Sequence, residues 1–162
     1  MSNPKIAIIM GSQSDLETMN EAVNLLKEFK AEYEVRVLSA HRTPEEVAKF
    51  AKDARKNGIK VIIAGAGGAA ALAGVIAAHT TLPVIGVPIE TSSLNGLDSL
   101  LSTVQMPGGV PVASMAIGRA GAKNAAIFAL EILGASDADM EKKLEAYKKS
   151  LAKKVKEIKL KV

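Results

Sequence analysis

Short, uninterrupted apolar runs alternate along this chain with stretches of helical periodicity. Ile6–Met10 is a continuous apolar run, as expected of a strand that is covered on both faces. A polar loop follows at 11–15, and the apolar residues of 16–26 then recur at steps of three and four, as on one face of a helix. This order of strand, loop and helix returns several times, and it predicts an α/β protein.

Five strands and six helices are expected. The strands are expected at 6–10, 33–38, 61–64, 82–87 and 112–117. The helices are expected from 16, from 44, at 69–78, near 97–104, at 122–133 and from about 137 to 160. Alternating strands and helices imply a parallel sheet with right-handed crossovers. The sequence therefore predicts a three-layer, doubly wound sheet of the flavodoxin-like kind, followed by a C-terminal helix.

The start of the second helix carries a clear sequence signal. Thr43 is expected to cap it, Pro44 to occupy its first position, and Glu46 to complete a capping box. Gly58 is expected to end it.

The length of 162 residues favours one domain, 1–162, with a catalytic core at about 5–135. The net charge of +4 belongs to the C-terminal helix, because 141–162 hold nine lysines and three glutamates. A lysine-rich segment can contact nucleic acid. Apolar residues recur within it at helical spacing, however, which favours a solvated helix face and no nucleic-acid partner.

Several classes of protein are disfavoured. The chain has no cysteine, so disulfides and thiolate metal sites are excluded, and a reducing, cytoplasmic location is expected. No secretory signal is visible at the N-terminus. The uncharged stretch 61–78 has the length of a membrane span, but its glycines divide it into a strand, a loop and a helix, so no membrane partner is expected.

A doubly wound sheet binds its ligand beyond the carboxyl ends of the strands. That rule brings together the loops 11–15, 39–42 and 65–68. Ser12 and other groups of the first loop suit a phosphate at a helix N-terminus. Asp15 has two open interpretations, a helix cap or an acceptor for ribose hydroxyls, and both roles are compatible.

The second loop holds the candidate for proton transfer. His41 is one of two histidines, and it follows a strand rather than lying on an apolar helix face. Arg42 beside it offers a planar fork suited to phosphate. His79, at the end of an alanine-rich run, is interpreted as structural or exposed. The glycines of 65–68 either let a ligand approach the backbone or let a helix pack closely.

Missing motifs narrow the chemistry further. The chain has no P-loop and no nucleophile elbow of the hydrolase kind. No metal-ligand spacing of histidines and carboxylates is present, so no metal is expected. The gathered loops lack an aromatic ring to stack on a flavin, and the first strand lacks the acidic cluster of a phosphorylated receiver.

Five motifs, in order, resemble one family. They are MGSQSD at 10–15, SAHRTP at 39–44, AGAGGAA at 64–70, the segment 82–113 and GAKNAA at 121–126. Together they cover about 5–135 and resemble the class I N5-carboxyaminoimidazole ribonucleotide mutases, the PurE family of purine biosynthesis. The resemblance implies an isomerase that moves a carboxylate from the exocyclic nitrogen of an aminoimidazole ribonucleotide to carbon C4. The family is thought to work by decarboxylation and recapture of the carbon dioxide, without a cofactor.

The resemblance also implies roles for residues. His41 matches the proton-shuttling histidine of the family. The expected substrate-binding positions are Ser12, Asp15, Ser39, Arg42 and Gly67, with Arg42 on the phosphate. The stretch 105–109 matches a loop that helps close the site, and the family forms octamers.

Two rival interpretations remain open. A class II carboxylase uses free carbon dioxide and typically carries lysine at position 42 and serine-asparagine in the third loop. This chain has Arg42 and Gly67-Gly68 instead, which is similar to class I. A non-catalytic nucleotide-binding module is the other rival, because Ala71 and Ala73 replace the usual histidine and proline of the family. That change either alters substrate binding or activity, or is natural variation.

Overall fold

The computed structural model describes residues 5–160. Five parallel strands form one sheet: β1 (Ile6–Met10), β2 (Tyr33–Val37), β3 (Val61–Ala66), β4 (Val84–Pro88) and β5 (Ala113–Ser114). Their order across the sheet is β2-β1-β3-β4-β5, the flavodoxin-like order of a doubly wound fold. The predicted fold class is confirmed.

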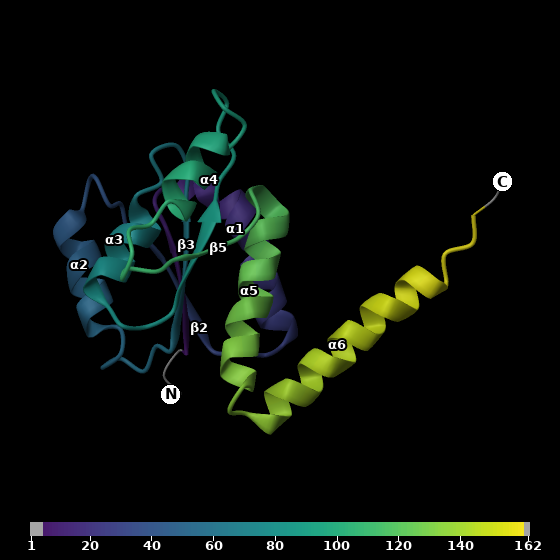
Figure 1. Cartoon of the computed structure of the whole chain (residues 1–162). Helices are drawn as coiled ribbons and strands as arrows, with labels where there is room; N and C mark the ends of the chain where they lie inside the picture. Colours follow the sequence, from purple (N-terminus) through teal and green to yellow (C-terminus); the bar gives the residue numbers. More distant parts are fainter. Residues whose placement is uncertain (1–4, 161–162) are drawn as a thin grey trace. The chain divides into compact units, whose positions relative to one another are not determined.

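A helix follows each strand. They are α1 (Leu16–Glu28), α2 (Pro44–Asp53), α3 (Leu72–His79), α4 (Leu97–Val104) and α5 (Gly118–Gly134), and α6 (Ala138–Lys156) comes last. A short 3-10 turn, η1 (Gln13–Asp15), precedes α1. Figure 1 shows α2 and α3 on one face of the sheet and α1 with the first part of α5 on the other. The predicted bounds of α4 agree with the structure at both ends.

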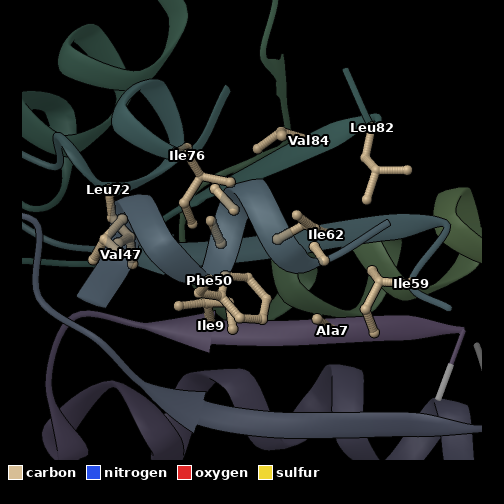
Figure 2. Close-up of a cluster of buried hydrophobic side chains, with 14 residues drawn as sticks. Ala7, Ile9, Val47, Phe50, Ile59, Ile62, Leu72, Ile76, Leu82 and Val84 are labelled. Carbon is tan, nitrogen blue, oxygen red and sulfur yellow. The ribbon is translucent and has the colours of Figure 1, made fainter. Parts of the chain in front are cut away.

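The side chains of β1 and β3 are almost entirely buried, as their unbroken apolar runs predict. Figure 2 shows one half of this core, where Phe50 and Val47 of α2 and Leu72 and Ile76 of α3 pack over the sheet residue Ile62. Each such side chain contributes roughly 1.5–3 kcal/mol when fully buried. The core holds the carboxyl ends of the strands in a fixed register.

Three local predictions are wrong. Thr43 does not cap α2 with its side chain, because its hydroxyl donates to the Ser39 carbonyl instead. The capping box lies in the first loop, where Ser12 and Asp15 form it. The residues 69–71, expected to be helical, form a turn before α3.

The length of the last strand and the place of Gly58 also differ from expectation. β5 has two residues rather than six. β2 agrees with the predicted strand to within one residue, and Val35 and Val37 on this edge strand are 39% and 53% exposed. Gly58 adopts a left-handed φ of 92° at the end of the turn after α2, five residues beyond the last helical residue, Asp53.

The chain divides into two compact units, one ending at Ala129 and one beginning at Leu130. In the second unit, Lys148 pairs with Glu131 at 3.0 Å and Asp137 caps the start of α6. The lysines of α6 also pair with acidic residues of the same helix, such as Lys149 with Glu145 at 3.7 Å. Among the helices of 5–160, none is long and apolar enough to span a membrane.

Candidate functional site

A cavity of about 490 Å³ lies at the carboxyl ends of the strands. All six residues predicted to bind or transform a ligand line it: Ser12, Asp15, Ser39, His41, Arg42 and Gly67. They come from the loops after β1, β2 and β3, which are adjacent strands in the sheet. Topology therefore brings together residues that are up to 55 positions apart in the sequence (12 to 67).

The first loop is held by its own backbone and side chains. The Ser12 N–H donates to Oδ2 of Asp15 at 2.9 Å, and the Ser12 hydroxyl oxygen accepts from the Ser14 hydroxyl at 3.0 Å. The Gly11 N–H donates to the Gly65 carbonyl at 3.2 Å, which ties this loop to β3. Asp15 thus has a structural role in the first loop.

Asp15 is only 8% exposed. Burial raises the pKa of its carboxyl group. Hydrogen bonds from the backbone at Ser12 and Gly11, and the positive charge of Arg42, act in the opposite direction without cancelling the effect of burial. Burial therefore makes the charged form of the carboxyl group less favourable, and hydrogen bonds from a polar ligand would offset that cost of burial.

The second loop presents two nitrogen-bearing side chains. Nη2 of Arg42 donates to the Gly11 carbonyl at 2.7 Å, and its Nε donates to the Ser39 hydroxyl at 3.2 Å. Ser39 thereby positions Arg42, which lines the cavity, and Nη1 of Arg42 has no hydrogen-bond partner within 5–160. His41 is exposed and makes no hydrogen bond within the same range, so both ring nitrogens are available.

The third loop contributes small residues. Ala66, Gly67, Ala70 and Ala71 line the cavity. A Cβ at Gly67 would lie 3.5 Å from the Thr91 methyl group and 3.6 Å from Cβ of Ile89, which is ordinary contact. The free protein therefore does not require glycine there, and close approach of a ligand is the better reason for it.

Ala71 and Ala73 lie in different environments. Ala71 lines the cavity at the position before α3, with helical backbone angles. Ala73 is 2% exposed and belongs to the hydrophobic core instead. Only Ala71 changes the surface that a ligand would meet.

The segment just after β4 forms a further side of the cavity that the sequence analysis did not predict. Ile89, Glu90 and Thr91, just after β4, also line the cavity. β4 lies next to β3 in the sheet. Because ligands bind beyond the carboxyl ends of the strands of a doubly wound sheet, the fold class itself predicts a contribution from this segment. Glu90 adds a carboxylate to the cavity.

Other candidates lie elsewhere. The stretch 105–109 does not line the cavity, so its role in closing the site stays a prediction. His79 is exposed at the last residue of α3, as the sequence indicated, and lines a separate groove with Arg55. In the described part of the chain, no three His, Asp or Glu side chains are arranged to hold a metal ion.

An arginine nitrogen, serine hydroxyls and a helix start suit a phosphate, the Asp15 carboxylate suits hydroxyl groups, and the histidine can move a proton. The arrangement is that of an α/β protein acting on a small phosphorylated ligand. Residues 5–154 match the family model described as AIR carboxylase. The chain belongs to this AIR carboxylase family.

Its relatives carry a consistent name. The N5-carboxyaminoimidazole ribonucleotide mutase of Saccharolobus solfataricus is 59% identical over 148 residues, which cover 91% of this chain and 92% of that protein. The mutase of Bacillus subtilis is 60% identical over 142 residues, 88% of each chain. Among solved structures, Treponema denticola PurE is 31% identical with a TM-score of 0.86, and the match covers 95% of both chains.

Proposed function

We propose that this protein is an N5-carboxyaminoimidazole ribonucleotide mutase of purine biosynthesis. Identity of about 60% to curated mutases, over nine-tenths of the chain, supports the activity. One observation assigns the activity to this cavity: Ser12, His41 and Gly67, which come from three separate motifs, all line it. The rearrangement converts the substrate to 4-carboxy-5-aminoimidazole ribonucleotide.

The reaction needs one proton added and one removed. Cleavage of the bond between the exocyclic nitrogen and the carboxylate releases carbon dioxide, and the nitrogen takes up a proton. Carbon C4 then attacks the carbon dioxide, and the new C4–carboxylate forms as C4 loses its proton. One group that both gives and takes a proton is sufficient, and His41 is such a group in the cavity.

The remaining residues bind and orient the nucleotide. Nη1 of Arg42 and the Ser12 hydroxyl are proposed to bind the phosphate, with Ser39 holding the guanidinium in place. The Asp15 carboxylate is proposed to accept hydrogen bonds from the ribose hydroxyls. Gly67 lets the flat imidazole ring lie against the backbone of the third loop.

One assay separates the proposal from its two rivals. Purified protein is given either freshly formed N5-carboxyaminoimidazole ribonucleotide or aminoimidazole ribonucleotide with bicarbonate, and the C4-carboxylated product is followed. Product from the first substrate alone supports the mutase. Product from the second alone would identify a class II carboxylase, and product from neither would leave a nucleotide-binding module.

We also propose that the protein acts as a homo-octamer in the cytoplasm, as its family resemblance implies. Four large apolar side chains, at the start of α4 and along it, are about half exposed in the single chain: Leu94, Leu97, Leu101 and Val104. Leu97, Leu101 and Val104 recur at steps of four and three, so they form one stripe on α4, and Leu94 lies in the turn just before the helix. An apolar stripe of this size is typical of a surface that another subunit covers.

A further inference from the structure

Ser99, on the first turns of α4, is a polar side chain inside the core. It is fully buried, at 0% exposed. Within the described residues, only Asp15 and Thr103 are other buried polar or charged side chains. Buried hydroxyls are costly unless they are hydrogen-bonded, so a serine here calls for a reason.

The Ser99 hydroxyl joins two segments that do not belong to its own helix. It donates to the Ile89 carbonyl at 2.7 Å and accepts from the Gly68 N–H at 2.9 Å. Ile89 lines the cavity after β4, and Gly68 follows Gly67, which lines it after β3. A single side chain, which itself lies outside the cavity, therefore connects two of its walls.

The loop that Ser99 holds has an unusual backbone. Gly68 has a φ of +67°, and Ala70, which lines the cavity, has a φ of +36° although it is not glycine. Such conformations persist only where surrounding contacts enforce them. Within the loop itself, a turn hydrogen bond from the Ala70 N–H to the Gly67 carbonyl, at 3.2 Å, is the main restraint.

Two other polar residues of α4, Asp98 and Ser102, also contact the segments after β4 and β3. Asp98 accepts from the hydroxyl of Thr91, another cavity residue, at 2.8 Å. The Ser102 hydroxyl lies 3.5 Å from the Gly68 carbonyl. Thr103 differs, because its hydroxyl donates at 2.7 Å to the carbonyl of Ser99 in its own helix. It does not line the cavity.

We propose that Ser99 is a positioning residue for the reaction. It sets the conformation of the loop 67–71, against which the substrate ring lies, without touching the substrate. The proposal rests on the proposed function, since that function makes the cavity the substrate site. Loss of the hydroxyl leaves the Gly68 N–H and the Ile89 carbonyl without their partner, and the loop shifts to regain one.

The test compares Ser99→Ala and Ser99→Cys with Thr103→Val. All three substitutions remove a buried hydroxyl of α4. Only the two at Ser99 disturb hydrogen bonds to Gly68 and Ile89, the segments beside the cavity. We expect both Ser99 variants to lower kcat by about tenfold to a hundredfold with a much smaller change in KM, since misplacement slows reaction more than it weakens binding. Thr103→Val should keep wild-type kcat despite a comparable loss of thermal stability. Ser99→Cys keeps nearly the volume of serine, so it covers the case in which Ser99→Ala folds poorly.

Hydrogen–deuterium exchange supplies a readout that does not depend on activity. The peptide containing 66–72 should exchange faster in both Ser99 variants and at the wild-type rate in Thr103→Val. Equal kcat in Ser99→Cys and Thr103→Val, or unchanged exchange of that peptide, would overturn the proposal. If the wild type itself makes no product, the proposed function fails, and the exchange data alone then decide whether Ser99 holds the loop.

Discussion

At the scale of single residues, His41 and Asp15 occupy contrasting positions in one cavity. His41 is exposed and makes no hydrogen bond within the described chain, whereas Asp15 is 8% exposed and bonded to the Ser12 backbone. The first arrangement leaves a side chain ready to exchange protons with a ligand. The second fixes a carboxylate in a site that opposes its charge. The consequences of substitution therefore differ.

Replacing His41 by asparagine should abolish turnover while largely preserving binding. Asparagine retains hydrogen-bonding groups but no group that titrates, and loss of such a catalyst typically lowers rates by about 10²–10⁴-fold. The measurement is kcat together with substrate affinity by calorimetry. His79→Asn is the matched control, since His79 lies in another groove, and it should retain full activity. Normal turnover by His41→Asn would show that the proposed role is wrong.

Replacing Asp15 by asparagine should stabilise the fold and weaken binding. Because burial raises the pKa of Asp15, the folded protein holds this proton more tightly than the unfolded chain does, and stability falls as pH rises through the interval between the two pKa values. The neutral amide avoids that loss and still accepts from the Ser12 N–H. Thermal unfolding should therefore favour the variant at pH 7, by a margin that shrinks as pH is lowered towards 4.

The same variant should raise KM by about tenfold or more, since a carboxylate forms stronger hydrogen bonds with hydroxyls than an amide does. A variant less stable than the wild type at pH 7 would contradict the proposed cost of burial. An unchanged KM would contradict the contact with ribose.

Restoring the family's usual histidine, by Ala71→His, should alter kcat by no more than about threefold, because the proton exchange is assigned to His41 alone. The backbone at this position is helical and accepts any side chain, so the variant should fold. Steady-state kinetics measure the effect. A tenfold gain in kcat would mean instead that the alanine limits this enzyme.

At the scale of elements, segments with a clear apolar pattern were predictable, and the length of the shortest strand was not. β1 and β3 followed from unbroken apolar runs, and α1 and α4 from their spacing. β2 was predicted to within one residue, although its Val35 and Val37 are exposed. β5 has only two residues, too few to carry a pattern of their own, so its length was overestimated. The topology of the fold class indicated which three loops meet, and the resemblance to a known family selected the six residues within them. The role of Ser99 was hidden, since two backbone partners in distant loops leave no signal in the sequence.

The start of α5 depends on a glycine. A Cβ at Gly121 would overlap the backbone carbonyl of Ala116, just after β5. We expect Gly121→Ala to lower stability by about 1–3 kcal/mol or more, because backbone must move to make room. Gly108→Ala is the control, since a Cβ there meets nothing within 4 Å and should be neutral. Thermal denaturation of both variants checks this, and equal midpoints would refute the close packing.

At the scale of the whole molecule, the single chain leaves apolar surface uncovered on α4. We expect Leu101→Lys, in the middle of that stripe, to convert the proposed octamer to smaller species, because a buried unpaired charge opposes association. Sedimentation velocity measures the change. Lys56→Glu, in the exposed turn after α2, is a control for altered charge and should leave assembly intact. An octamer that persists in Leu101→Lys would place the subunit contacts elsewhere.

The cavity lies at the carboxyl ends of the parallel strands, so their amino ends lie on the side of the sheet away from it. The turn 54–58 leads into β3 at its amino end, away from the cavity, and the chain contains no cysteine. A single thiol introduced at Lys56 would therefore be a unique attachment point for a fluorophore or a surface tether. A reporter placed there would follow the assembly of the protein while substrate enters and leaves unhindered.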